Sequence, residues 1–255
     1  MGSTKYVVGI DIGGSGVKGA PVRAKTGALV TDRFRIPTPK PATPQAVAEV
    51  VAEVARESGW TGGPIGCTVP AVVRRGVVQT AANIDASWVG VKAAKLFRKA
   101  LGGDAKVAVL NDADAAGIAE MRFGAGRGER GTTLLLTFGT GIGSAVFVGK
   151  KLWPNAELGH IRYDDRICEH VAADSVRQRQ HLTWERWGKK RVQPVLEYYE
   201  FLFSPDRIII GGGVSKPGKW ELFGPALKTR AKLVPAQLGN EAGIVGAAMA
   251  ARALK

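Results

Sequence analysis

Cysteine is scarce in this chain of 255 residues, and long apolar runs are missing. The two cysteines, Cys67 and Cys168, are too few for a disulfide framework or a cysteine-rich zinc site. We expect two reduced thiols, with Cys67 as a small buried residue of an apolar run. No stretch reaches the roughly 18 consecutive apolar residues of a membrane helix, and the N-terminus lacks the pattern of a signal peptide. The sequence therefore predicts a soluble, globular, cytoplasmic protein without a membrane partner.

Acidic residues are fewer than basic residues in this sequence. Asp and Glu number 22 against 36 Lys and Arg, which gives a net charge of +14 and an isoelectric point near 10.0. Such a field attracts nucleic acid, an anionic membrane surface or a highly charged phosphate compound. Aromatic residues make up only 7% and do not alternate with the basic ones, which argues against a single-strand nucleic-acid binder. The basic residues are dispersed, and each is first interpreted as a solvated surface residue.

Strand and helix patterns alternate along the chain. Apolar, β-branched runs at 6–12 and 17–22 flank a glycine turn and predict a β-hairpin. Helical spacing is seen at 45–56 and 93–101, and strands are expected at 65–72 and 106–110. The Ala-rich stretch 112–123 and the apolar C-terminal stretch 241–254 are predicted to be helices. This alternation indicates an α/β architecture with mixed sheets.

The hairpin pattern occurs a second time. A strand at 132–137 is followed by a glycine turn and a strand at 144–148, and a buried strand at 207–210 leads into Gly211, Gly212 and Gly213. Polar, Trp-containing sequence at 174–199 is expected to form helices over this second half. The repeat predicts two similar lobes that face each other across a cleft. We expect the smaller lobe to span 1–111 with 241–255 and the larger lobe 112–240.

The two turns carry the residue types that bind phosphate. Glycines remove side-chain bulk and permit positive φ, so backbone amides can converge on an anion. In the first turn, Asp11 is placed to hold a hydrated Mg²⁺ and Lys18 to neutralise phosphate charge. An ordinary hairpin turn is an equally good interpretation of this segment alone. The second turn, 139–143, strengthens the phosphate interpretation because two loops can hold one polyphosphate chain.

Other polar positions leave alternatives open. Asp112 and Asp114 follow a short strand at the start of a helix, where Asp is a common N-cap, yet a carboxylate there can also accept the proton of a sugar hydroxyl. Glu157 and His160, three residues apart, fit a fragment of a metal site, a pair of sugar ligands or a solvated turn. Asn83 is either a turn residue or a hydrogen-bond partner of a ligand hydroxyl.

Five segments, in order, resemble the ROK family of sugar kinases, and within it the polyphosphate glucokinases and glucomannokinases. They are DIGGSGVKGA at 11–20, ANI at 82–84, NDADAA at 111–116, LTFGTGIGSA at 136–145 and ELGH at 157–160. The glycine turn at 211–213 and NEAGIVGAA at 240–248 fit as well. The resemblance covers nearly the whole chain and implies the two-lobed, actin-like ATPase (ribonuclease H-like) fold.

The resemblance also assigns roles to residues, with Asp112 as the catalytic base. Phosphate-donor binding is implied for Asp11, which is also the Mg²⁺ position, and for Gly13, Gly14, Ser15, Lys18, Gly139, Thr140, Gly141, Gly212 and Gly213. Sugar binding is implied for Asn83, Asn111, Asp112, Glu157, His160 and Glu169. Only Cys168 lies where many family members have a Cys-rich zinc motif, so we expect no structural zinc.

The predicted function is an Mg²⁺-dependent kinase that phosphorylates the 6-hydroxyl of glucose, with mannose as a second sugar. The expected donor is inorganic polyphosphate, with ATP as a second donor, and the charge of +14 suits a polyanion. Arg122, Arg127, Arg130, Lys150 and Lys151 are candidates for a basic track along the polyphosphate. A strictly ATP-dependent kinase and a non-catalytic sugar sensor are the alternatives. A first strand at about Tyr6 leaves no room for the helix-turn-helix of ROK repressors, so no nucleic-acid partner is expected. The family resemblance also implies a homodimer.

Overall fold

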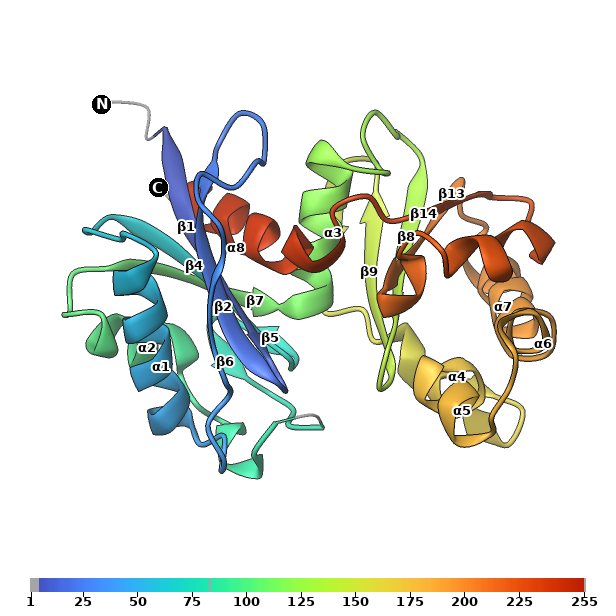
Figure 1. Ribbon diagram of the computed structural model, residues 1–255, viewed down its shortest axis with the longest axis horizontal. Helices are drawn as coiled ribbons and strands as arrows, with labels where there is room; N and C mark the ends of the chain where they lie inside the picture. The colour runs from blue at the N-terminus through green and yellow to red at the C-terminus, as the bar shows by residue number, and fades with distance from the viewer. Residues whose placement is uncertain (1–4, 83, 255) are drawn as a thin grey trace. The chain divides into compact units, whose positions relative to one another are not determined.

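The computed structural model describes residues 5–82 and 84–254, which divide into two compact units. The first unit runs to Ala119 and includes the C-terminal segment from Glu241, and the second unit is Glu120–Asn240 (Figure 1). The change of unit falls inside helix α3 (Asp112–Phe123), eight residues after the boundary expected from the sequence. The assignment of lobes to 1–111 and 112–240 stays a prediction.

The first unit contains a mixed five-stranded sheet in the order β3-β2-β1-β4-β7. The strands β1 and β2 pair antiparallel as the predicted hairpin, whereas β4 and β7 run parallel to β1. Their bounds are β1 Tyr6–Gly13, β2 Gly16–Arg23, β3 Phe34–Ile36, β4 Pro64–Val69 and β7 Lys106–Asn111. A short hairpin of β5 (Val73–Arg74) and β6 (Val77–Val78) follows β4.

The two faces of this sheet are packed differently. The predicted helices α1 (Pro44–Glu57) and α2 (Ala93–Ala100) cover one face, and α8 (Ala242–Arg252) lies on the other (Figure 1). Alternate residues of β1, such as Ile10 and Ile12, join Val47 and Val51 of α1 in an apolar core. On the α8 face, a Cβ on Gly9 or Gly66 would overlap the backbone of α8, so these glycines let the helix approach the strands closely.

The second unit repeats the same sheet order. Its strands β10-β9-β8-β13-β14 pair as β3-β2-β1-β4-β7 do, with two antiparallel pairs followed by two parallel pairs. The bounds are β8 Thr132–Phe138, β9 Ile142–Val148, β10 Lys151–Trp153, β13 Arg207–Gly212 and β14 Lys232–Pro235. The predicted second hairpin is confirmed, and the shared order supports the two similar halves inferred from the repeat.

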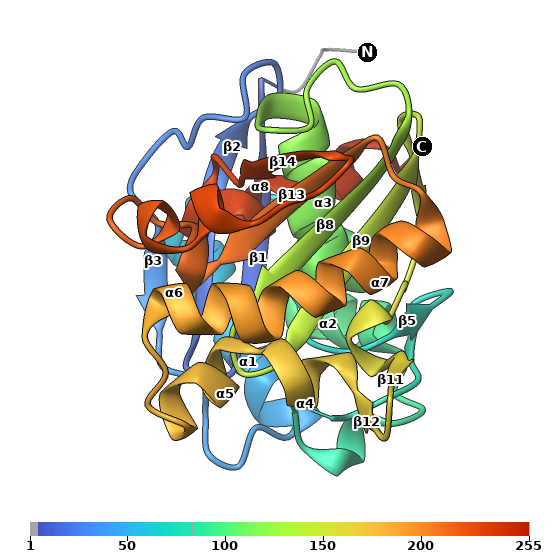
Figure 2. The same ribbon diagram turned by 90° about the vertical axis from the view of Figure 1, so that its right-hand side faces the viewer.

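Helices cover one face of this second sheet (Figure 2). They are α4 Cys168–Ala172, α5 Asp174–Arg179, α6 Trp184–Trp187 and α7 Gln193–Phe203, with a wider π-helical turn, Gly188–Val192, between the last two. Trp187 and Tyr199 are fully buried against Phe138 and its strand neighbours. The helices expected over 174–199 are confirmed.

Both cysteines are buried and free, as expected, and burial raises the pKa of each thiol. None of the helices in the described part of the chain is both long and apolar enough to cross a bilayer.

Candidate functional site

The first glycine loop joins β1 to β2 through Gly14 and Ser15. Its carbonyl groups are held by side chains from the segment after β2: Thr38 Oγ1 donates to the Gly13 carbonyl, and Arg35 Nη2 donates to the Ser15 carbonyl at 2.7 Å. Within the described residues, the amides of Gly14 and Ser15 have no hydrogen-bond acceptor. A loop with bound carbonyls and open amides is suited to binding an anion.

The second loop, Gly139–Gly141, is built in the same way. Ser175 of α5 donates its backbone N–H to the Gly139 carbonyl at 3.0 Å and its hydroxyl to the Thr140 carbonyl at 2.7 Å. In the described part of the chain, the amides of Thr140 and Gly141 have no acceptor. The two loops, one in each unit, therefore share a construction as well as a sequence pattern.

The glycines were expected to remove side-chain bulk and to permit positive φ. Gly13, Gly14, Gly139 and Gly141 have no positive φ, and Gly212 alone of the predicted set has one, of 83°. Gly14, Gly139 and Gly213 have no atom within 4 Å of the place where a Cβ would stand. Neither packing nor backbone strain thus requires glycine at these three positions. Their open surroundings leave room for a ligand to approach the backbone.

Asp11 lies on β1 beside the first loop and is held from three directions. Thr68 Oγ1 donates to Asp11 Oδ1 at 2.9 Å, and Lys18 Nζ lies 3.8 Å from Oδ2. The start of α8 is so close that a Cβ on Gly243 would stand 2.7 Å from the Asp11 carboxyl, which places the positive end of this helix against the carboxylate. Asp11 and Lys18 are cross-strand partners in the β1–β2 register, so the hairpin itself positions them together.

Asp112 begins α3 and is exposed, whereas its neighbour Asn111 is buried. Asn111 Oδ1 accepts from the amides of Ala113 at 2.8 Å and Asp114 at 3.0 Å, the two bonds that an N-cap makes. Asn111 Nδ2 also donates to the Ala71 carbonyl at 3.3 Å. The capping role left open for Asp112 or Asp114 therefore belongs to Asn111, and the Asp112 carboxylate at the next position is presented to solvent.

A small cavity of about 120 Å³ lies next to the first loop. Its lining includes Gly13, Gly14, Thr38, Pro70 and Ile84. Asn83, which was predicted to bind the sugar, lies outside the described residues. Ile84, which follows it, lines the cavity next to the first loop.

Glu157, His160 and Glu169 come together in the second unit. His160 Nδ1 lies 3.6 Å from Glu157 Oε2, and its Nε2 lies 3.7 Å from Glu169 Oε1. Burial is the main cause that raises the pKa of Glu157. The negative charge of Glu169 raises it further, and His160 opposes the shift. An imidazole between two carboxylates offers several acceptors and donors to a polyhydroxyl ligand.

Glu169 also connects this cluster to the second loop. Its Oε2 accepts from the Ile142 amide at 3.3 Å, and a Cβ on Gly141 would overlap the same oxygen. A side chain at position 141 would therefore displace the Glu169 carboxylate from its place behind the loop. Gly159 packs equally closely on the Ile142 carbonyl, which fixes the 3-10 turn Leu158–His160 against β9.

Sequence reasoning missed the residues that hold these groups in place, among them Arg35, Thr38, Thr68, Ser175 and Gly243. Thr68 gave a weak signal, since it is a polar residue inside the apolar strand β4 and is fully buried. Gly243 lies in the segment 240–248 that resembles the family, but nothing in that segment linked it to Asp11, and the other three stand in segments with no local pattern that points to the loops.

No cluster of three His, Cys, Asp or Glu side chains that could hold a metal exists among the described residues. Asp11 supplies one carboxylate, whose Oδ2 faces Lys18 at 3.8 Å. This arrangement fits Mg²⁺ as it commonly binds at phosphoryl-transfer sites, where one or two carboxylates, waters and substrate phosphates share the coordination.

The fold is that of a sugar kinase of the actin-like class. The ROK family profile matches residues 7–173. The chain belongs to the ROK family. It is 50% identical over 247 residues to the polyphosphate glucokinase of Mycobacterium tuberculosis strain H37Rv, covering 96% of this chain and 91% of that protein. The predicted family and fold class are thereby confirmed.

Two solved structures are also similar. The inorganic polyphosphate/ATP-glucomannokinase of Arthrobacter sp. strain KM superposes with a TM-score of 0.90 at 47% identity, covering 96% of this chain and 98% of that one. A ROK family glucokinase from Streptomyces griseus, solved with glucose and AMPPNP, has a TM-score of 0.78 at 25% identity and covers 97% and 99% of the two chains.

Proposed function

We propose that this protein transfers a phosphoryl group from inorganic polyphosphate to the 6-hydroxyl of glucose, with ATP as a second donor and mannose as a second sugar. The observation that carries the proposal is the pair of glycine loops in which carbonyl groups are bound, while the amides of Gly14, Ser15, Thr140 and Gly141 have no acceptor among the described residues. Similarity over 96% of the chain to a polyphosphate glucokinase and to a polyphosphate/ATP-glucomannokinase supports the choice of donor and sugar.

In the proposed reaction, the Asp112 carboxylate accepts the proton of the glucose 6-hydroxyl as this oxygen attacks the terminal phosphorus. The bond between that phosphorus and the bridging oxygen breaks, and the polyphosphate leaves one phosphate shorter. The open amides of the two loops stabilise the charge on the transferring group. Bound Mg²⁺, held by Asp11 and the phosphates, supplies further charge neutralisation.

The roles of the remaining polar residues follow from their surroundings. Lys18 is proposed to bind donor phosphate beside Asp11, from which it lies 3.8 Å away. Glu157, His160 and Glu169 are proposed to bind sugar hydroxyls, and Asn111 is proposed to orient Asp112 by capping α3. A cytoplasmic location belongs to the same proposal.

Homodimer formation is a separate part of the proposal. Phe201 and Leu202 of α7 are 78% and 43% exposed, and exposed apolar side chains grouped on one helix favour association. Analytical ultracentrifugation is expected to give twice the chain mass of 26.9 kDa. A monomer at micromolar concentration would contradict this part and leave the kinase proposal intact.

The deciding experiment measures glucose 6-phosphate formed by the purified protein with long-chain polyphosphate or ATP as the only donor. We expect activity with polyphosphate and loss of activity with EDTA. Activity with ATP alone would identify a strictly ATP-dependent kinase, and glucose binding without any phosphorylation would identify a sugar sensor.

A further inference from the structure

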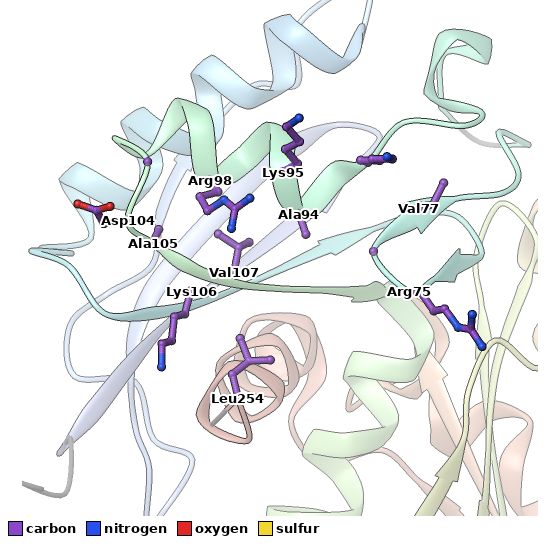
Figure 3. A pocket seen from close by; sticks show the side chains of 13 residues that line it. Arg75, Val77, Ala94, Lys95, Arg98, Asp104, Ala105, Lys106, Val107 and Leu254 are labelled. Atoms are coloured by element: carbon purple, nitrogen blue, oxygen red, sulfur yellow. The ribbon is translucent and has the colours of Figure 1, made fainter.

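A cavity of about 690 Å³ lies in the first unit, and its described lining includes none of the residues predicted for catalysis, sugar binding or donor binding. It follows the outer edge of β7, the edge strand of the first sheet, is bordered by α2 and the β5–β6 turn, and is open to solvent. Figure 3 places Lys106 near the start of β7, Lys95 and Arg98 on α2 beside it, and Arg75 near the other end of the strand. The cationic residues are therefore spread along the strand and the neighbouring helix.

Cations dominate the lining. Arg75, Lys92, Lys95, Arg98 and Lys106 contribute five positive charges, and Asp104 is the single carboxylate among the described lining residues. Within the described part of the chain, none of these five cations forms an ion pair or a side-chain hydrogen bond. Like charges gathered without partners repel one another, and an anionic ligand would remove that cost.

The turn that carries Arg75 is itself unusual. Arg75 and Gly76 form a two-residue hairpin loop with φ values of 51° and 74°, so an arginine occupies a left-handed position where Asn, Asp or Gly is preferred. A residue at positive φ that is not one of these carries a modest energetic cost. This turn conformation places the Arg75 side chain at one end of the cavity lining.

The same hairpin is connected to the start of α3. It is tied to the residues before α2 through the Val78 amide, which donates to the Val91 carbonyl at 3.0 Å. Upstream of β5, the Ala71 carbonyl accepts from Asn111 Nδ2. The row of cations thus ends at the segment that supports Asn111 and Asp112.

We infer that this cavity is an accessory binding site for linear inorganic polyphosphate, which holds a part of the chain remote from the phosphoryl group being transferred. The inference rests on the proposed function. Arginine and lysine residues spread along a strand and its neighbouring helix suit a linear chain of phosphates, since Arg and Lys are the side chains that bind phosphate oxygens.

A nucleotide or a single-stranded nucleic acid fits the cavity less well than polyphosphate does. Such ligands are normally held by aromatic stacking, and none of the described lining residues is aromatic. Protection of the edge strand does not account for the cations either. Charges that keep an edge strand from pairing with another chain stand on the strand itself, yet Lys92, Lys95 and Arg98 belong to α2 and the residue before it.

The test removes two charges from α2 in the variant Lys95→Gln/Arg98→Gln. We expect the KM for long-chain polyphosphate to rise roughly 5- to 20-fold, while kcat and the KM values for ATP and glucose stay unchanged. With tripolyphosphate as donor the change should vanish, because a short chain cannot reach both sites. The matched control, Lys25→Gln/Lys99→Gln, removes the same charge outside the cavity and should behave as the unsubstituted protein.

Direct binding provides a readout that does not depend on turnover. Isothermal titration of long-chain polyphosphate, without sugar, should give weaker binding for Lys95→Gln/Arg98→Gln than for the control. Lys95→Gln alone should show a smaller change in the same direction. This single variant keeps the test valid if the double variant does not fold.

The outcomes that overturn the inference are distinct from those that overturn the kinase proposal. Equal KM and equal binding in the cavity variant and the control would remove the accessory site while polyphosphate-dependent activity persists. An equal rise in the KM for ATP, or displacement of polyphosphate by single-stranded DNA at equal phosphate concentration, would also overturn it. Absence of polyphosphate-dependent activity in the unsubstituted protein would instead refute the proposed function.

Discussion

Asn111 and Asp112 have separate roles at the start of α3. Asn111 caps the helix, and Asp112 is the proposed general base. Because Asn111 makes the N-cap bonds to Ala113 and Asp114, the start of α3 does not rest on Asp112 alone. The Asp112 carboxylate is exposed, and its Oδ1 accepts from the Ala113 amide at 2.9 Å. This separation is favourable for a general base, which must change its protonation during the reaction.

Replacing the proposed base tests this separation directly. Asp112→Asn should lower kcat for glucose phosphorylation by about 10²- to 10⁴-fold, because an amide cannot accept the hydroxyl proton. Its melting temperature should stay near that of the unsubstituted protein, since the amide oxygen can still accept from Ala113. Asp32→Asn, at another exposed aspartate, is the matched control and should retain full activity. Retention of kcat in Asp112→Asn would refute the assignment.

Glu157 gives a pH-dependent prediction. Its folded-state pKa is raised mainly by burial, so the stability it contributes is present at low pH and is lost as pH rises through the folded pKa. Glu157→Gln removes this dependence. The variant should therefore melt above the unsubstituted protein at pH 8, with a difference that shrinks toward pH 4. The difference should be small, because the carboxyl is 35% exposed and partly screened by water. Melting curves at several pH values measure it, and a difference that grows toward pH 4 would contradict the prediction.

The strands and helices show two uses of glycine. Where α8 crosses β1 and β4, glycine is needed because a Cβ on Gly66 would overlap the Ala247 carbonyl. In the hairpin loop, Gly14 has open space around its Cβ position and an ordinary φ. The fold thus requires glycine at position 66, whereas at position 14 it does not, and ligand binding is the proposed reason for glycine there.

This contrast yields a paired prediction. Gly66→Ala should lower the free energy of unfolding by about 3 kcal/mol and the melting temperature by roughly 6 to 12 °C, because the helix must move off the sheet. Thermal unfolding measures both values.

Gly14→Ala should leave the melting temperature unchanged or slightly higher, since alanine fits the native φ without strain. The KM for the phosphate donor should rise by about 10-fold, while the KM for glucose stays constant, because the methyl group stands where phosphate oxygens are proposed to lie. An unchanged donor KM would indicate that the first loop is an ordinary hairpin turn.

The charge of the whole molecule, +14, acts over longer distances than any one contact. It raises the local concentration of a polyanionic donor, and dissolved salt screens this attraction over a Debye length of about 10 Å at 0.1 M. Neutral glucose is affected neither by the charge of the protein nor by its screening by salt.

Ionic strength should therefore separate the two substrates. Raising potassium chloride from about 50 to about 300 mM should increase the KM for long-chain polyphosphate several-fold and leave the KM for glucose nearly constant. Steady-state kinetics at constant Mg²⁺ provide the measurement. A parallel change in both KM values would point to a general effect of salt on the protein.

Much of the fold was predictable because it depends on neighbours in the sequence. Alternating apolar residues at 6–12 and helical spacing at 45–56 correspond to β1 and α1 within a residue or two. The repeated hairpin predicted two similar halves, and the sheets share one strand order. The phosphate loops and the pair Glu157 and His160 were likewise chosen from local sequence and from the family resemblance.

The sequence by itself determined the local elements, the residue types at each loop and the excess of positive charge. Only the tertiary structure decided which groups meet: Thr68 with Asp11 across 57 positions, Ser175 with the Thr140 carbonyl across 35, and Glu169 with the Ile142 amide across 27. A turn or a helix is specified by contacts within a few residues. The partner of a buried carbonyl or carboxylate is instead set by the order in which strands and helices pack, and no short stretch of sequence records that order.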